Sequence, residues 1–466
     1  MSKEDTLPQA ATAKQGAAMK EGLVIGLLGF TVILIVMNTM MFNLALPKIT
    51  QEFGLTSIGA SWIVTGYSIV FAISAITYTR LSDFVPIRKL FTIGLACLGA
   101  ASILGFFSHN FLMLLCARLL QASGAAAVPG LAIVLVTRFI PITRNGRAMS
   151  IIMSASSLGL GLGPVIGGSI TQFLGWNSLF LVTGISLLLI PFFYRLLPQE
   201  KAQAGTFDFV GAVFIGVGTT GLLLYLTSRS WLMLAVGLVA LLSFWVRIHR
   251  ARNPFVSPAL FRNKPYLMLS SLGIVSYINN FATLFLLPQV LAHLFALTPG
   301  ESGLIIFPGA IISMVASNWI GKMIDRYGND LLLRYAPLLL LVAAATFALL
   351  VGWSFYAIMV SYMLLSIGFS ALTTSVSNEM ARILHKEEVG AGMGLFQLTQ
   401  FFSGAFSVAV TGSTLASQKG IALTDVYAEI FWGMTAVAVL AILCSIGYHF
   451  MKQARARRMN VGLSGE

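Results

Sequence analysis

Residues 22–46 read GLVIGLLGFTVILIVMNTMMFNLAL, an uncharged and strongly apolar stretch. About 20 such residues in a helix cross a hydrocarbon core of about 30 Å. The stretch is longer than the apolar region of a signal peptide, and no cleavage pattern follows it, so we expect it to remain as the first transmembrane helix. The polar residues before it, 1–21, are expected to form a cytoplasmic tail.

Similar apolar runs recur along the whole chain of 466 residues. Hydrophobic residues make up 57% of the chain and charged residues only 10%, whereas soluble domains carry roughly 25% charged residues. Runs this long must be helices, because membrane-spanning strands need only about ten residues. The sequence therefore predicts fourteen transmembrane helices, at 22–46, 58–79, 88–107, 111–139, 147–173, 176–196, 207–228, 230–247, 265–294, 301–323, 331–351, 354–382, 388–415 and 427–450.

The positive charges predict the orientation. The net charge is +13, and Lys and Arg accumulate in the cytoplasmic loops of membrane proteins. With fourteen helices and a cytoplasmic N-terminus, only Lys48, Arg229 and Lys419 fall in outer loops. An odd number of helices would destroy this bias, so we expect both termini in the cytoplasm. The charge thus indicates a lipid bilayer as the partner and no nucleic acid.

Two polar breaks divide the chain, the longer one between Arg247 and Pro265. They predict a six-helix block at 22–196, two additional helices within 207–247, a cytoplasmic linker at 248–264, a second six-helix block at 265–450 and a basic cytoplasmic tail at 451–466. Within the linker, the stretch FVSPALF at 255–261 is short and apolar enough to lie along the membrane surface.

An aspartate follows the second helix of each six-helix block, in LSDFVPIRK (81–89) and in GKMIDRYG (321–328). Two related bundles around a central cavity are the transporter architecture that this repeat indicates. We interpret both copies as gates in basic cytoplasmic turns, in which Asp83 would accept hydrogen bonds from a neighbouring helix N-terminus. The alternative is that these charges only anchor the loops. The gate residues are Asp83, Arg88, Lys89, Asp325 and Arg326.

The order of several short stretches resembles that in the major facilitator superfamily, and specifically in its fourteen-helix drug:proton antiporters of the Gram-positive tetracycline and multidrug exporter type. The resemblance covers almost the whole chain and rests on NLALP (43–47), LSD (81–83), ARLLQASG (117–124), GPVIGG (163–168), IIFPG (305–309) and GAGM (390–393). It implies an all-α membrane protein with the major facilitator fold, built from two six-helix bundles plus two extra transmembrane helices.

The same resemblance implies a multi-pass transporter of a bacterial plasma membrane, which is not an enzyme and needs no cofactor. It implies secondary active export of an amphipathic drug or metabolite by alternating access, in exchange for protons. An ATP-driven pump is disfavoured, because the chain contains no Gly-x-x-x-x-Gly-Lys-Ser/Thr loop. A receptor or scaffold without transport activity is the alternative from another class. The cysteines Cys97, Cys116 and Cys444 show no metal-ligand spacing.

Two motifs carry the coupling role that the resemblance implies. Arg118 lies inside an apolar helix, where a guanidinium is costly unless it is paired or faces water. With Gln121 and Gly124 it resembles the motif of the fourth helix, which couples transport to proton movement; the alternative is an arginine that bonds carbonyls of other helices. The second motif resembles the antiporter signature of the fifth helix, where glycines allow close packing and proline bends the helix. It comprises Gly163, Pro164, Gly167 and Gly168, and simple small-residue packing is its alternative.

No acidic residue lies clearly at mid-membrane depth. Relatives of the tetracycline exporter type carry acids where this chain has Thr39 and near Gly404. A cation in a cavity without a carboxylate is costly, so a transporter of anionic or lipid-like substrates, uncoupled or differently coupled, is the alternative function on this fold. Proton carriage would fall to Asp83, Glu379 or His293, of which histidine titrates near neutral pH.

Polar side chains on the expected gating helices are the candidates for the substrate cavity. Amides in lipid must find partners, so they should face inward. The alternative for each is that it bridges two helices. The candidates are Asn38, Thr39, Asn43, Trp62, Tyr67, Asn279, Asn280, Gln397 and Gln400.

Overall fold

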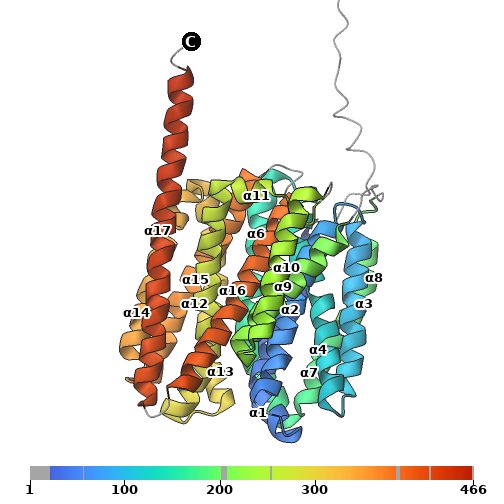
Figure 1. The fold of residues 1–466 in the computed structure, drawn as a ribbon, viewed down its shortest axis with the longest axis vertical. Coiled ribbons are helices and arrows are strands. Elements are labelled where there is room, and N and C mark those ends of the chain that lie inside the picture. The colour runs from blue at the N-terminus through green and yellow to red at the C-terminus, as the bar shows by residue number, and fades with distance from the viewer. Residues whose placement is uncertain are drawn as a thin grey trace, which may run out of the picture.

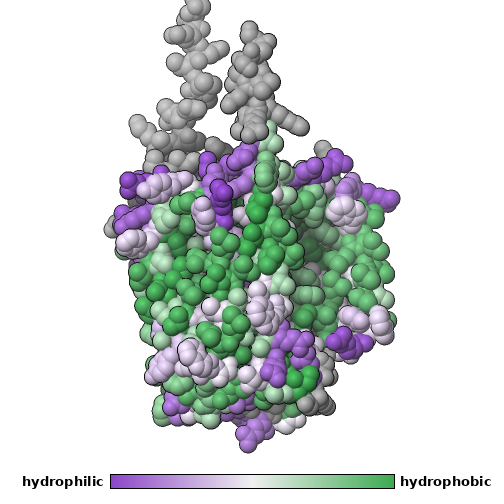
Figure 2. Space-filling model, turned by 90° about the vertical axis from the view of Figure 1, so that its left-hand side faces the viewer, coloured by the Kyte–Doolittle hydropathy of each residue, from purple (hydrophilic) through white to green (hydrophobic). Residues whose placement is uncertain are grey.

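A computed structural model describes residues 21–55, 57–200, 207–251, 254–384, 389–418 and 421–463. In these ranges the chain consists of helices and turns, without a strand. Fourteen helical segments of the described chain are long and apolar enough to cross a membrane, which confirms the predicted number. Their apolar surface forms a belt, with hydrophilic residues gathered above and below it (Figure 2).

The first half of the molecule corresponds to the first six predicted spans. Two of these spans are interrupted. The span 111–139 breaks at Ala126, because Pro129 has no N–H to bond the carbonyl of Ala125. The elements are α1 (Glu21–Glu52), α2 (Ser57–Leu81), α3 (Ile87–Phe106), α4 (Phe111–Ala125), α5 (Ala127–Phe139), α6 (Ile142–Phe173), η2 (Trp176–Ser178), α7 (Leu179–Gly184) and α8 (Ser186–Leu196).

The second half begins at α12, and its helices α13 and α17 extend by a turn or more beyond their predicted C-terminal ends. Asp325 and Arg326, expected in a turn, belong to the last turn of α13, which ends before Gly328 at φ 76°. Helix α17 continues past residue 450 and rises above the bundle (Figure 1). The elements are α12 (Lys264–Phe295), α13 (Pro299–Tyr327), α14 (Asp330–Leu350), α15 (Phe355–Ile383), α16 (Val389–Ser417) and α17 (Leu423–Leu463).

The two additional helices, α9 (Phe209–Ser228) and α10 (Trp231–Arg250), lie between the halves in the view of Figure 1. Helix α9 packs against α2 of the first half and α16 of the second half. It therefore covers one seam between the halves, while α6 and α13 pack together along another.

The linker after α10 does not lie along the membrane surface. The linker contains the short helix α11 (Ala259–Arg262). Three of the linker's apolar side chains are almost completely buried in the protein, namely those of Phe255, Val256 and Leu260. The backbone N–H of Phe255 donates to Asp208 (3.2 Å), and Arg80 donates to the Pro254 carbonyl (2.8 Å). The first bond holds the linker against the start of α9, and the second holds it against the first half.

One end of the bundle carries most of the ionic contacts, and we call it the basic end. Arg80, Arg138, Arg247 and Lys452 all form ion pairs there. It is the upper end in Figure 1, where α17 projects. The opposite end, which contains the α9–α10 turn, is called the far end.

Candidate functional site

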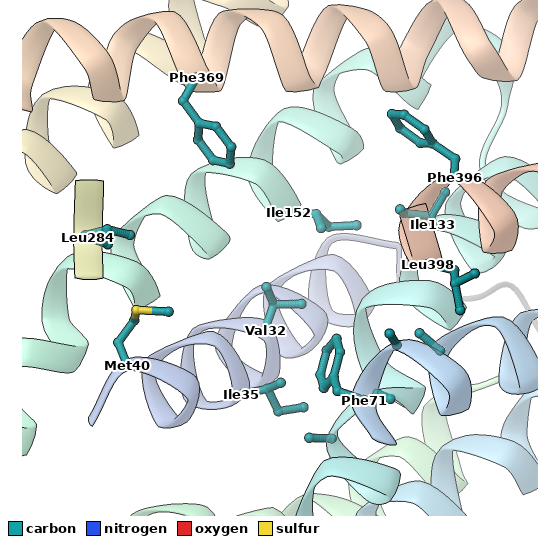
Figure 3. Packing of buried hydrophobic residues seen from close by; sticks show 14 of the residues in the cluster. Val32, Ile35, Met40, Phe71, Ile133, Ile152, Leu284, Phe369, Phe396 and Leu398 are labelled. Carbon is teal, nitrogen blue, oxygen red and sulfur yellow. The ribbon is translucent and has the colours of Figure 1, made fainter. Parts of the chain in front are cut away.

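A cavity of about 100 Å³ lies between the two halves. Helices α1, α2, α5 and α6 line it from the first half, and α12, α15 and α16 from the second. Several of its lining residues are labelled in Figure 3, among them Met40 on α1, Ile152 on α6 and Phe369 on α15. Pockets for drug-sized ligands measure about 300–1,000 Å³. The structure therefore represents a contracted state, which admits such a molecule only when the halves separate.

Aromatic rings form one wall of the cavity. Tyr277 packs against Phe281 (5.5 Å between ring centroids), Phe369 (5.3 Å) and Phe401 (5.8 Å), all from the second half. Phe71 of α2 joins this cluster edge-on at 4.6 Å from Phe401. Rings in such pairs stabilise each other and present flat apolar faces. The contact of Phe71 with Phe401 also connects the two halves across the cavity.

The hydroxyl groups of the cavity are mostly occupied. Those of Thr39, Ser156 and Thr373 donate to backbone carbonyls of their own helices, at 3.2, 3.0 and 2.7 Å. The side-chain amides of Gln397 and Gln400 also line the cavity, and the Gln397 Oε1 atom has no hydrogen-bond partner. No Asp, Glu, Lys, Arg or His is among the described lining residues. The cavity is thus an uncharged aromatic site with two amides.

Arg118 is buried inside the first half, with 1% of its surface exposed. Its guanidinium lies 3.9 Å from the ring centroid of Phe42 and 4.1 Å from that of Tyr67. It donates to Gln121 Oε1, and Gln121 donates in turn to the Thr183 hydroxyl at 2.9 Å. The cation is thus held by two aromatic faces and one side-chain amide. The alternative from the sequence, an arginine that bonds backbone carbonyls of other helices, is not found among the described contacts.

Among the described residues no carboxylate forms an ion pair with Arg118. The Tyr67 ring stacks on Phe71 of the cavity wall at 5.9 Å. These distances place the guanidinium no more than about 10 Å from the Phe71 ring. A second cation at that separation meets a repulsion of about 1.7 kcal/mol at an effective dielectric constant of about 20. Arg118 therefore disfavours cations at this wall of the cavity.

Of the predicted substrate residues, Thr39, Gln397 and Gln400 line the cavity. Asn38 lies inside the first half, where it donates to the Tyr67 hydroxyl at 3.4 Å. Asn279 and Asn280 are buried in the second half but are not among the lining residues, and neither is Trp62. The side chain of Asn43 falls outside the described part of the chain.

The glycines of α6 point in two directions. Gly159, Gly163 and Gly167 lie at a spacing of four residues and pack on α1, where an added Cβ would lie 2.6–2.9 Å from α1 atoms. Gly161 faces the other half, and a Cβ there would overlap the Ala310 Cβ on α13. Pro164 and Gly168 are buried in the same helix, as is Gly124 of α4, which approaches the α3 backbone at Leu98. Small residues thus pack α6 within its half and also between the halves.

At the basic end of the first half, Asp83 pairs with Arg80 (3.2 Å) and Arg138 (3.5 Å). Burial raises the pKa of the Asp83 carboxyl, although both arginines act in the opposite sense. The helix N-terminus nearby, at Ile87 of α3, donates to Glu200 (2.8 Å) instead of to Asp83. Of the other gate candidates, the Arg88 guanidinium lies 3.4 Å from the Tyr194 ring centroid, and Lys89 is exposed.

In the second half, Asp325 reaches across to α6. An added Cβ at Gly146 would lie 2.5 Å from Asp325 Oδ1. Arg326 is exposed and lies over the ring of the adjacent Tyr327. Glu379 is buried away from the cavity and accepts hydrogen bonds from Asn329 (2.7 Å), Tyr448 (2.9 Å), Arg382 (3.2 Å) and Lys452 (3.3 Å), so it joins α15 to α17. His293 contacts the Tyr427 hydroxyl (2.8 Å) near the far end.

Comparison with known families agrees with this architecture. The sequence profile of the Major Facilitator Superfamily matches residues 28–408 and 269–462. The chain belongs to this superfamily. Its two halves and the cavity between them are therefore the architecture of a transporter family.

Two transporters and one solved structure show how far the similarity extends within the superfamily. The cephamycin export protein CmcT of Amycolatopsis lactamdurans is 29% identical over 88% of each chain. The riboflavin transporter RibZ of Clostridioides difficile (strain 630) is 27% identical over 61% of this chain, and the match spans 64% of that protein, less than two thirds of its length. The crystal structure of the human organic anion transporter MFSD10 (TETRAN) covers 91% of this chain with a TM-score of 0.68 at 16% identity, which shows a shared fold.

Proposed function

We propose that this superfamily member is a secondary active exporter, which carries amphipathic organic molecules across a bacterial plasma membrane by alternating access. The observation that carries the proposal is the cavity lined by both halves, because a site between two separable bodies can open to either side of the membrane. The names of two relatives, a cephamycin exporter and a riboflavin transporter, favour small organic substrates.

The position of the cavity favours export. Its lining residues on α15 (Ser370 to Ser377) and on α16 (Met393 to Phe401) belong to the parts of these helices nearer the basic end. The basic end should face the cytoplasm, because Lys and Arg are retained on that side. The contracted cavity is therefore closer to the cytoplasmic entrance, from which an exporter loads its substrate.

Two contacts between the halves form the proposed cytoplasmic gate. Asp325 lies against Gly146, and the Thr79 hydroxyl lies where a Cβ at Gly394 would be. Toward the far end, Gly303 of α13 approaches the Val165 backbone, with 3.3 Å between an added Cβ and the Val165 Cα. Opening to one side would break one set of contacts and keep the other, as alternating access requires.

Transport by the purified full chain in proteoliposomes, with an imposed pH gradient, tests this proposal. Cationic, neutral and anionic aromatic compounds are compared, and protein-free liposomes give the background. We expect saturable uptake of at least one class into vesicles whose protein has its basic end outside. The absence of saturable, protein-dependent movement of all three classes would overturn the proposal. Saturable movement that ignores the pH gradient would favour the uncoupled alternative.

For the coupling, we propose that Asp83 carries the proton. Two cations and two neutral donors contact the Glu379 carboxylate and stabilise its charged form. By contrast, burial raises the pKa of Asp83. The ion pairs of Asp83 with Arg80 and Arg138 are therefore intact above this raised pKa and lost below it. The cytoplasmic pH would thus determine whether the two ion pairs of Asp83 are formed.

Asp83→Asn should uncouple transport from the pH gradient, because the amide is neutral at every pH. We expect the initial rate of the variant to be the same with and without the gradient, while the wild type is accelerated about tenfold or more by one pH unit. Asp330→Asn is the matched control, because Asp330 is an exposed basic-end carboxylate that pairs with Lys452. A full response to the gradient in Asp83→Asn would contradict this assignment.

A further inference from the structure

The cavity contains two side-chain amides in an otherwise apolar, aromatic setting. Gln397 and Gln400 lie three residues apart on α16, and both line the cavity. Their side chains are almost completely buried, with 7% and 4% of the residue surface exposed. Each amide offers both a donor and an acceptor.

These amides are not used up by the protein itself. Gln397 Oε1 has no hydrogen-bond partner and faces Gly130 of α5, where an added Cβ would lie 3.2 Å away. The Gln400 carbonyl accepts from the Ser403 hydroxyl, but no hydrogen bond of the Gln400 side chain is found in the described part of the chain, and its Nε2 atom faces Gly273 of α12 at 3.3 Å from an added Cβ. Buried polar atoms in proteins nearly always have a hydrogen-bond partner. A bound ligand would provide the missing partner here. By contrast, the hydroxyls of Thr39, Ser156 and Thr373 already donate to backbone carbonyls.

The walls beside the amides select for flat molecules. The Tyr277 ring contacts those of Phe281, Phe369 and Phe401 along the second half, and Phe71 contacts Phe401 from the first half. A planar aromatic ligand between these rings replaces ring–ring contacts by similar ones. A cation could also bind aromatic faces. Here it would lack a carboxylate partner among the described lining residues, and the Arg118 guanidinium lies behind Phe71 and Tyr67.

We propose that the substrate is a planar, uncharged aromatic molecule with an N–H group next to a carbonyl, as in a lactam or an imide, and that Gln397 and Gln400 recognise this edge. The proposal rests on the proposed function, since it uses the same cavity. An amide side chain pairs with such an edge through one donated and one accepted hydrogen bond. The ligand binds when the halves move apart, because the contracted cavity of about 100 Å³ is smaller than such a molecule.

The test measures equilibrium binding to the full chain in lipid nanodiscs. The probes are 1,8-naphthalimide, its N-methyl derivative, which lacks the N–H group, and N-methylacridinium, a planar cation. We expect saturable binding of naphthalimide, with the N-methyl derivative and the cation each about tenfold weaker or more. Gln397→Met and Gln400→Met keep the side-chain length and should remove most of the preference for naphthalimide over its N-methyl derivative. The control is Gln289→Met, because Gln289 bonds the Phe285 carbonyl outside the cavity.

Every result of the binding assay either supports or overturns the proposal. Equal binding of naphthalimide and its N-methyl derivative, tighter binding of the cation, no binding of naphthalimide, or an unchanged preference in both glutamine variants would each overturn the proposal. The assay does not depend on transport. Selective binding without movement in proteoliposomes would contradict the proposed function but not the substrate class. Transport of cations alone would contradict the substrate class but not the proposed function.

Discussion

Arg118→Met should lower transport at least about tenfold while the protein still folds. The change keeps the length of the side chain but removes the guanidinium that lies 3.9 Å from Phe42 and 4.1 Å from Tyr67. It also leaves the buried Gln121 Oε1 atom without its donor. Loss of a desolvated cation–π contact and of a buried hydrogen bond together costs about 3 kcal/mol.

The effect on transport follows from the position of this cluster. Phe42 is on α1 and Tyr67 is on α2, so Arg118 of α4 connects the two helices that hold Thr39 and Phe71 at the cavity wall. Arg118→Lys should restore little, since a lysine lacks the planar group that stacks on both rings.

Initial rates in proteoliposomes, normalised to the amount of folded protein, measure this prediction, and thermal unfolding of the same samples separates stability from transport. Arg195→Met is the matched control, because Arg195 is exposed at the end of α8. Wild-type transport by folded Arg118→Met would contradict a role of Arg118 in transport.

Gly161→Ala should reduce transport by a similar factor through a different cause. The added methyl group would overlap the Ala310 Cβ, so α6 and α13 would have to separate by about 2 Å to restore normal carbon–carbon contact. Overpacking of this kind costs about 1–3 kcal/mol. Because these helices belong to different halves, the cost falls on the closed arrangement of the halves, and the population of that state should fall about tenfold.

A compensating change makes this prediction specific. Ala310→Gly removes the methyl group that Gly161→Ala would meet, so the double variant should recover most of the wild-type rate. Gly26→Ala serves as the control, because nothing lies within 4 Å of a Cβ added there. If the double variant remains as slow as Gly161→Ala alone, close contact between α6 and α13 is not the cause.

The helices and their grouping were predictable because they depend on local properties. Long uncharged runs and the distribution of Lys and Arg report on the bilayer directly. The position of Arg118 inside an apolar helix was also visible in the sequence, but its hydrogen bond to Gln121 was not predicted, although residues three apart meet on a helix. The amides Gln397 and Gln400 were found by the cost of burying polar groups in lipid.

The aromatic wall was not predictable in this way. Tyr277, Phe281 and Phe369 are indistinguishable in composition from lipid-facing aromatic residues, and only the rotation of α12 and α15 in the bundle turns them toward the cavity. For the same reason, Asn279 and Asn280 face inward, as expected, but into their own bundle. Glu200 was missed because its bond to Ile87 joins segments that are far apart in the chain.

The alternation of Gly159, Gly161 and Gly163 shows how much one helix rotation decides. Residues two apart point to opposite sides of a helix, so Gly159 and Gly163 contact α1 while Gly161 contacts Ala310 of the other half. The sequence predicted close packing of this segment but not the division between a seam within one half and a seam between the halves.

The central claim is that the two halves open alternately at the basic end and the far end. Distances between spin labels in nanodiscs, measured by pulsed electron paramagnetic resonance in a cysteine-free background, test it most directly. One pair, Lys89→Cys and Tyr327→Cys, spans the halves at the basic end, and the other, Leu112→Cys and Trp353→Cys, spans them at the far end, all at exposed positions. When pH or a bound substrate shifts the state, we predict that one distance grows while the other shrinks. Distances that stay constant, or that change in the same direction, would contradict the account.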